Sequence, residues 1–250
     1  MEHENKKIYG LIGKNIQYSF SRKFFLEKFN KESIINTDYK IFDIPKIENV
    51  SLIFQKPYLK GCNVTIPYKT SIMSFLTHIT PEAKSIGSVN VVKIHNQCTT
   101  GFNTDILGFE YSFKKNLNHI NQKNLKALIL GTGGVSKTIS FVLNKLKISY
   151  QYVSRKKNKN FLSYEDINQN LLKEYRIIIN CTPVGTYPNI NSCPSLPYQY
   201  ISHDHYFYDL VYNPNQTLFL KKAEEKGAIT KNGLEMLYIQ AEESWKIWKM

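Results

Sequence analysis

A glycine-rich stretch, GTGGVS from Gly131 to Ser136, is the clearest chemical signal in the sequence. It follows the apolar run LKALIL at 125–130 and precedes a helix-like pattern, which is the context that a dinucleotide-binding fingerprint needs. Gly131 allows a tight turn, Gly133 lets the backbone approach a pyrophosphate, and the free N–H groups at the helix start attract phosphates. Ser136 replaces the third glycine of the strict pattern, so a plain strand-turn-helix loop is the alternative interpretation.

A basic run, Ser154-Arg155-Lys156-Lys157, stands at the end of the next expected strand. An acid at this point would bind the ribose of NAD, but no acid occurs before Glu165. A carboxylate would repel a 2′-phosphate, whereas arginine and lysine would attract it. The run therefore favours NADP over NAD, and the alternative is a solvated basic loop. Only three arginines occur in the chain, which favours a specific planar contact for Arg155.

Two further stretches place polar side chains where buried strands should end. NVTIPYK runs from Asn63 to Lys69, and GFNTD runs from Gly101 to Asp105 at the start of an expected helix. Ligands bind at the carboxyl ends of strands in open α/β sheets, so these stretches offer a lysine and a carboxylate to a candidate site. Most Lys and Asp side chains are exposed, and nothing in the spacing of these two brings them together.

Apolar runs and helix-like patterns alternate along the chain. We expect strands at 7–13, 37–44, 59–64, 125–130, 149–153, 176–181 and 206–211, a hairpin at 88–94 and 97–101, and helices at 104–117, 135–147, 163–174, 216–226 and 233–249. Further helices are expected from Ser21 and after Pro67, and a linker or helix end at Asn116–Asn124. The alternation predicts an α/β protein with a parallel sheet covered on both faces.

Composition bounds the class of protein. The 250 residues suffice for one large domain or two modest ones. The chain has no apolar run of about eighteen residues and its N-terminus lacks a signal-peptide core, so we expect a cytoplasmic protein without a membrane partner. The net charge of +13 suggests acidic partners, but the lysines are dispersed and no recognition motif accompanies them, so we expect no nucleic-acid partner. No cysteine has the spacing of a zinc ligand, so we expect no metal.

Collinear motifs resemble the shikimate dehydrogenase family over nearly the whole chain. The matching stretches are 9–21 (YGLIGKNIQYSFS), 61–69 (GCNVTIPYK), 86–92 (IGSVNVV), 101–109 (GFNTDILGF), 128–137 (LILGTGGVSK), 178–188 (IINCTPVGTYP), 208–214 (YDLVYNP) and 232–240 (NGLEMLYIQ). A collinear set of this kind is far more specific than any one of its members.

The resemblance implies a role for each matching residue. Lys69 and Asp105 match the catalytic pair of the family. The implied substrate contacts are Ser19, Ser21, Thr65, Asn90, Tyr212 and Gln240. The implied cofactor contacts are Gly131, Thr132, Gly133, Gly134, Ser154, Arg155, Lys156, Thr182 and Gly233.

The implied reaction is the reversible, NADPH-dependent reduction of 3-dehydroshikimate to shikimate, on the route to the aromatic amino acids. Hydroxyl and amide side chains suit a substrate with several hydroxyls, because a site built to bond each hydroxyl rejects analogues that lack one. NADP(H) supplies the hydride, and Lys69 can hydrogen-bond the C3 oxygen and donate the proton. Asp105 would orient Lys69, and which of the two carries the proton stays open.

Departures from the family pattern leave alternatives. Arg22 stands where the family usually has a proline, which could shift the helix start and Ser21. Ser154 and Lys156 replace an asparagine and a threonine, so NADP preference is an expectation. A quinate or dual quinate/shikimate dehydrogenase is the nearest alternative, and a non-catalytic ligand-binding paralogue or a basic nucleic-acid binder is the alternative of another class.

The expected architecture has two α/β domains. Residues 1–104 with 232–250 would form a substrate-binding catalytic domain, and 105–231 a Rossmann-type NADP-binding domain. We expect the active site in a cleft between them, and a monomer or homodimer whose partner is the small-molecule substrate.

Overall fold

The computed structural model describes residues 6–17, 19–117, 124–156 and 159–250. The chain divides into two compact units. The first comprises 1–104 and 241–250, and the second comprises 105–240. None of the helices in the described ranges is long and apolar enough to cross a membrane.

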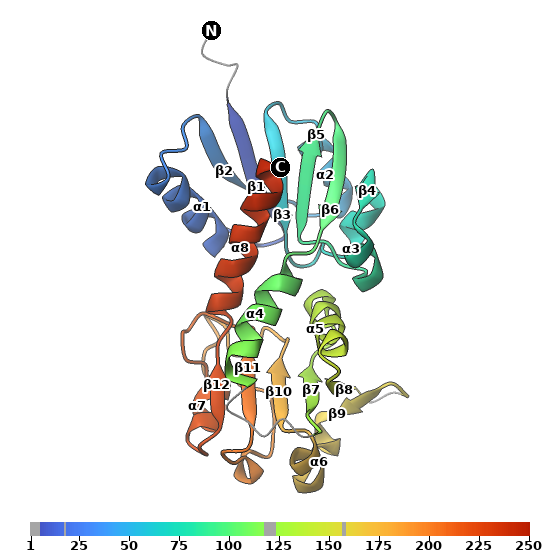
Figure 1. The fold of residues 1–250 in the computed structure, drawn as a ribbon, viewed down its shortest axis with the longest axis vertical. Helices are drawn as coiled ribbons and strands as arrows, with labels where there is room; N and C mark the ends of the chain where they lie inside the picture. The colour runs from blue at the N-terminus through green and yellow to red at the C-terminus, as the bar shows by residue number, and fades with distance from the viewer. Residues whose placement is uncertain (1–5, 18, 118–123, 157–158) are drawn as a thin grey trace. The chain divides into compact units, whose positions relative to one another are not determined.

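The first unit contains a mixed six-stranded sheet (Figure 1). Its elements are β1 Lys7–Gly13, α1 Phe20–Lys31, β2 Thr37–Asp43, η1 Ile47–Asn49, α2 Val50–Phe54, β3 Leu59–Val64, η2 Ser71–Phe75, β4 His78–Ile79, α3 Pro81–Ile86, β5 Val91–His95, β6 Cys98–Phe102 and the end of α8 Leu234–Lys249. The strand order is β2-β1-β3-β5-β6-β4. Strands β2, β1 and β3 are parallel, while β5 runs antiparallel to both β3 and β6. The expected strands and the expected hairpin are therefore present.

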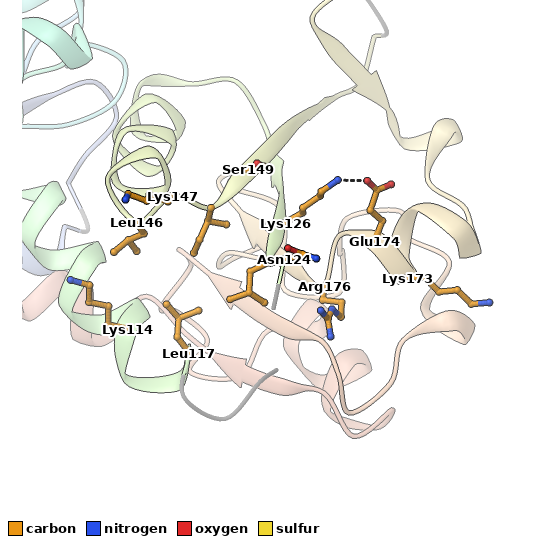
Figure 2. A pocket seen from close by; sticks show the side chains of 12 residues that line it. Lys114, Leu117, Asn124, Lys126, Leu146, Lys147, Ser149, Lys173, Glu174 and Arg176 are labelled. Carbon is orange, nitrogen blue, oxygen red and sulfur yellow. Dashed lines mark hydrogen bonds and ion pairs between the residues drawn. The ribbon is translucent and has the colours of Figure 1, made fainter. Parts of the chain in front are cut away.

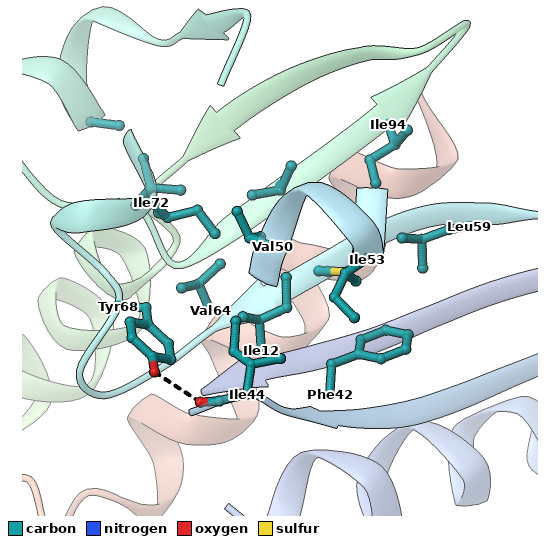
Figure 3. Close-up of a cluster of buried hydrophobic side chains, with 14 residues drawn as sticks. Ile12, Phe42, Ile44, Val50, Ile53, Leu59, Val64, Tyr68, Ile72 and Ile94 are labelled. Atoms are coloured by element: carbon teal, nitrogen blue, oxygen red, sulfur yellow. Dashed lines mark hydrogen bonds between the residues drawn. The ribbon is translucent and has the colours of Figure 1, made fainter. Parts of the chain in front are cut away.

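Both faces of this sheet are covered. On one face, α1 and α8 pack aromatic side chains against β1 and β2, and Trp248 stacks on Tyr9 with 4.8 Å between ring centroids. On the other face, a second cluster joins residues of β1, β2 and β3 to α2 and η2 (Figure 3). A side chain alternates faces along a strand, so Leu11 belongs to the first cluster and Ile12 to the second.

The second unit contains an all-parallel six-stranded sheet (Figure 1). Its elements are α4 Asp105–Leu117, β7 Lys126–Leu130, α5 Gly134–Lys145, β8 Ser149–Ser154, β9 Phe161–Ser163, η3 Tyr164–Asp166, α6 Gln169–Glu174, β10 Ile177–Asn180, η4 Tyr198–Tyr200, β11 Tyr206–Asp209, α7 Leu218–Glu224, β12 Ile229–Lys231 and the start of α8. The order is β12-β11-β10-β7-β8-β9. Counted within this sheet, that is the 3-2-1-4-5-6 order of dinucleotide-binding folds.

Helices cover this sheet on both faces, as a parallel sheet requires. Phe109 and Phe113 of α4 pack against Tyr208 and Tyr206 of β11, with ring centroids 5.1 and 5.4 Å apart. On the opposite face, a cluster joins β7 and β10 to α6 and α7. The predicted α/β class with a parallel sheet is confirmed.

Some expected elements differ from those observed. The helix expected after Pro67 is only the short 3-10 helix η2, and Val89 N–H donates to the Lys69 carbonyl at 2.8 Å. That bond ties the backbone after β3 to the segment that precedes β5. The helix expected at 163–174 begins only at Gln169, because Asn168 caps it by accepting from Leu171 N–H at 3.0 Å. The centre of the linker expected at 116–124, residues 118–123, lies outside the described residues.

Candidate active site and cofactor-binding edge

The predicted catalytic lysine and four predicted substrate contacts lie at one edge of the first sheet. Ser19 and Ser21 follow β1, while Thr65 and Lys69 follow β3, which runs parallel to β1. Asn90 directly precedes β5, which runs antiparallel to β3. The end of β1, the end of β3 and the start of β5 therefore lie at the same edge of the sheet. The structure brings these five residues to one edge, although they come from three separate stretches of sequence.

Ser19 and Ser21 lie at the start of α1. Ser19 is the N-cap, and its hydroxyl accepts from Ser21 N–H at 3.3 Å. The Ser21 side chain lies close to the buried Tyr39 phenol. Helix α1 begins at Phe20, and Arg22 is exposed on its first turn. The arginine that replaces the usual proline therefore leaves both serines at the helix start.

Lys69 lies in a half-buried turn between β3 and η2. Next to it, the buried Tyr68 donates its hydroxyl to the Ile44 carbonyl at 2.8 Å (Figure 3). The Lys69 carbonyl accepts from Val89 N–H at 2.8 Å. These two bonds hold the backbone at Lys69 and at the residue before it. The point from which the lysine side chain extends is therefore fixed.

A buried polar network lies beneath this edge. Tyr39 donates to Asn63 Oδ1 at 2.8 Å, and Asn63 Nδ2 donates to Ser244 Oγ at 2.9 Å. Ser244 Oγ lies 3.3 Å from Thr104 Oγ1, which accepts from Asn90 Nδ2 at 3.0 Å. Thr104 N–H donates to Asn90 Oδ1 at 2.7 Å. A bonded network of this kind holds one orientation of each amide, so the Asn90 side chain is held rigidly. Ser244 was not among the residues predicted from the sequence.

Asp105 is the first residue of α4 and is only 5 % exposed. A carboxylate in the first turn interacts favourably with the positive end of the helix dipole. It directly follows Thr104, whose backbone and side chain are bonded to Asn90. The backbone just before Asp105 is thus held by the bonds between Thr104 and Asn90. Lys69 belongs to the first unit and Asp105 to the second, so their pairing remains a prediction.

The glycine turn has the geometry that the fingerprint predicts. Gly131 follows β7 with φ of 101°, a left-handed conformation that favours glycine. Its N–H donates to the Val153 carbonyl at 2.8 Å. Gly133 is the N-cap of α5, and a Cβ added there would meet no atom within 4 Å. Thr132 is exposed and Gly134 is the first residue of α5. The helix start is therefore open to an approaching phosphate.

The basic run lies at the neighbouring strand end. Ser154 is the last residue of β8, which pairs with β7, and its hydroxyl accepts from Lys156 N–H at 3.4 Å. Arg155 and Lys156 are both exposed. Because β7 and β8 are parallel, their ends place these cations at the edge that holds the glycine turn. Lys157 lies outside the described residues.

Three more predicted contacts follow the other strands of this sheet. Thr182 comes after β10, Tyr212 after β11, and Gly233 after β12. All these strands are parallel to β7, so the three residues share its edge. Gly233 cannot carry a side chain, because a Cβ there would lie 2.2 Å from the Leu210 carbonyl oxygen. Gln240 lies on α8, where its Nε2 donates to the Leu237 carbonyl at 2.9 Å.

A buried carboxylate at the same edge was not anticipated from the sequence. Asp209 ends β11 and is fully buried, and it accepts from Asn180 Nδ2 at 2.9 Å, from Val211 N–H at 3.0 Å and from Thr217 Oγ1 at 2.6 Å. Burial raises the pKa of Asp209 to about 6, against the lowering effect of these hydrogen bonds. The signal in the sequence is a polar residue that ends an apolar strand, as in IIIN and YFYD.

Comparison with known proteins decides the family. Residues 11–92 match the shikimate dehydrogenase substrate binding domain. A shikimate dehydrogenase (NADP(+)) of Methanococcus vannielii is 38 % identical over 96 % of this chain and 90 % of its own length. The chain belongs to the shikimate dehydrogenase family. The prediction made from the collinear motifs is confirmed.

Solved structures of this family share the fold. A shikimate dehydrogenase crystallised in complex with NADP+ matches with a TM-score of 0.84 at 31 % identity, over 99 % of this chain and 91 % of its own. The Thermus thermophilus shikimate 5-dehydrogenase in complex with NADP(H) and shikimate matches with a TM-score of 0.82 at 26 % identity, over 97 % of this chain and 93 % of its own.

The cofactor-binding edge of this shikimate dehydrogenase family member fits a dinucleotide phosphate. The left-handed Gly131 and the space in front of Gly133 leave room for a pyrophosphate at the start of α5. Helix α5 has no acidic residue in its first turn, so nothing there opposes the attraction of its dipole for phosphate. Arg155 and Lys156 add positive charge beyond β8, where a ribose phosphate would lie.

A hollow of about 1090 Å³ lies at the opposite edge of the same sheet (Figure 2). Lys126 and Ser149, the first residues of β7 and β8, line it. Lys126 forms an ion pair there with Glu174, and Arg176 lines the hollow beside them. Since the glycine turn follows the other end of β7, this hollow is separate from the predicted cofactor-binding edge.

Proposed function

We propose that this chain catalyses the reversible, NADP(H)-dependent interconversion of 3-dehydroshikimate and shikimate. The observation that carries the proposal is the match over nearly the full chain to relatives named as NADP-dependent shikimate dehydrogenases. The glycine turn of the parallel sheet supports it, because that turn suits a dinucleotide. The hydroxyl and amide side chains at one edge of the mixed sheet also support it, because they suit a substrate with several hydroxyls. Residues 1–104 with the C-terminal helix would bind substrate, and the parallel-sheet unit would bind cofactor.

The reduction adds a hydride to the C3 carbonyl carbon and a proton to the carbonyl oxygen, and bound NADPH supplies the hydride. Lys69 is proposed to hydrogen-bond this oxygen and to donate the proton, so that the carbonyl becomes an alcohol. Asp105 is proposed to orient the lysine amine and to accept a hydrogen bond from the C3 hydroxyl of the alcohol. In the reverse direction the same pair would take the proton from the hydroxyl.

The remaining contacts would fix the substrate ring. Ser19 and Ser21, at the start of α1, are proposed to bind the substrate carboxylate, where the helix N-terminus favours a negative charge. Thr65, Asn90, Tyr212 and Gln240 are proposed to bond the ring hydroxyls. Asn90 is well suited, because its amide orientation is fixed by Thr104. The glycine turn, Ser154 to Lys156, Thr182 and Gly233 are proposed to hold NADP(H).

An absorbance assay of reduced-cofactor formation tests the proposal. Purified full-length protein would receive shikimate or quinate, each with NADP+ and with NAD+ in parallel. We expect formation of reduced cofactor with shikimate and NADP+ to exceed that of the other three combinations. Faster turnover of quinate with NAD+ than of shikimate with NADP+ would indicate a quinate dehydrogenase. No turnover of either substrate would indicate a non-catalytic ligand-binding paralogue.

Arg155 is expected to determine the preference for NADPH. Replacement by alanine should raise the KM for NADPH by about 10- to 100-fold, the worth of a charge-assisted hydrogen bond to phosphate, and leave the KM for NADH unchanged. Arg176→Ala is the matched control, because this arginine precedes β10 at the opposite edge of the sheet. Equal losses with NADPH and NADH would refute the assignment.

The cellular location and the assembly expected from the sequence, cytoplasmic and monomeric or homodimeric, stay predictions. Light scattering of the purified protein would distinguish the two assembly states.

A further inference from the structure

Asp209 is a buried carboxylate surrounded by neutral groups. Its hydrogen-bond partners are an amide side chain, a backbone N–H and a hydroxyl. Cys181, Tyr198 and Tyr208 are titratable groups of the described residues that interact with it electrostatically, and burial raises the pKa of each, so these three stay uncharged near neutral pH. Burying a charge without an opposite charge is costly. Its place at the end of β11 therefore calls for a role other than stability.

One branch of contacts runs from Asp209 to the loop after β10. Asn180 Nδ2 donates to Asp209, so Asn180 Oδ1 must face the other way. That oxygen accepts from Thr182 N–H at 3.0 Å and from Thr182 Oγ1 at 2.6 Å. An ionised carboxylate only accepts hydrogen bonds, so it excludes the flipped amide of Asn180. The Thr182 methyl lies against the glycine turn, 2.9 Å from a Cβ built on Gly131.

A second branch runs to the loop after β11. Val211 N–H and the Thr217 hydroxyl both donate to Asp209, so the carboxylate closes this loop at its two ends. Thr217 also caps α7 by accepting from Leu220 N–H at 3.3 Å. Tyr212 lies inside the closed loop, and the Val211 carbonyl accepts from Gly233 N–H at 3.2 Å. One carboxylate thus anchors two loops that follow adjacent strands.

We propose that Asp209 is a positioning residue for the dinucleotide and the substrate, acting through Asn180 on the loop that carries Thr182 and through Thr217 on the loop that carries Tyr212. The inference rests on the proposed function, since those loops are where the cofactor and substrate contacts are expected. Asp209 is fully buried, so no contact with either ligand is proposed for its own side chain. It sets the direction of the Asn180 amide, which holds Thr182 beside the glycine turn, and it fixes the loop on which Tyr212 stands.

The test measures NADPH binding directly, by fluorescence titration of the full-length protein, together with thermal unfolding. Asp209→Ala removes the acceptor of the Val211 N–H and of the Thr217 hydroxyl, and leaves Asn180 Nδ2 only its longer bond to the Val184 carbonyl at 3.4 Å. The Asn180 amide is then held less firmly, so the Kd for NADPH should rise about tenfold or more. Asp209→Asn keeps an acceptor for Asn180 and Val211 and should restore most of the affinity. Tyr208→Phe is the matched control. Tyr208 precedes Asp209 on β11, and the change removes a buried hydroxyl that donates to Ser112 of α4.

A purely structural role predicts a different result. Asp209→Ala would then lower the unfolding temperature, as is expected for Tyr208→Phe, while the Kd for NADPH stayed at the wild-type value, and that outcome overturns the inference. If Asp209→Ala does not fold, Thr217→Val serves instead. This variant removes the bond that closes the Tyr212 loop together with the cap of α7, and it leaves the bond between Asp209 and Asn180 in place. It should raise the KM for shikimate more than the Kd for NADPH, and wild-type values of both would refute the inference. Wild-type protein that binds no NADPH would refute the proposed function instead.

Discussion

Replacing Lys69 with alanine is expected to lower kcat for shikimate oxidation by about 10²–10⁴-fold, the usual contribution of a general acid or base. The amine is the group proposed to exchange a proton with the C3 oxygen. The backbone around it is held by Tyr68 and by Val89 N–H, so the truncation should leave the turn in place. Initial rates at saturating shikimate and NADP+ measure the effect.

Two further variants separate proton transfer from charge. Lys69→Arg keeps a positive charge, but a guanidinium does not give up its proton in proteins, so kcat should fall almost as far as in the alanine variant. Lys60→Ala removes an exposed lysine of β3, the strand that precedes Lys69, and should leave kcat unchanged. Near-normal turnover by Lys69→Ala would remove the lysine from the mechanism.

Asp209 is expected to make the stability of the protein depend on pH. Its pKa in the folded protein is about 6 against an ordinary value of 3.8, so the folded state holds a proton that the unfolded state has lost between those values. Stability from this group is therefore fully present below about pH 4 and is lost as the pH rises through 6. The shift corresponds to about 3 kcal/mol, at about 1.4 kcal/mol for each pKa unit.

Denaturant unfolding of wild type and Asp209→Asn at a series of pH values measures this contribution. Relative to the variant, wild type should gain about 2–3 kcal/mol between pH 7 and pH 4, because asparagine does not titrate. Tyr208→Phe should show a stability difference from wild type that does not change over this range, since burial raises the pKa of that phenol far above it. A constant difference between wild type and Asp209→Asn would contradict the prediction.

The dinucleotide-binding elements were predictable because their signals are local. An apolar run, the turn around Gly131 and a helical pattern lie next to one another in the sequence, and the structure has β7, the turn and α5 in that order. The basic residues after β8 were predictable for the same reason. The sequence predicts the ends of strands less closely than their centres. The helix expected after Pro67 was wrong, because the backbone there bonds to a residue distant in the sequence, Val89.

The collinear motifs in the sequence determined the family, the α/β class and the residues proposed to act. Tertiary structure decided which buried groups hold them, because the burial of a polar residue and its partners depends on contacts far apart in the chain. Asn63 meets Ser244 across 181 positions, and Asp209 meets Asn180 across 29. No local pattern encodes such pairs, because they depend on which strands and helices lie beside one another in the folded chain.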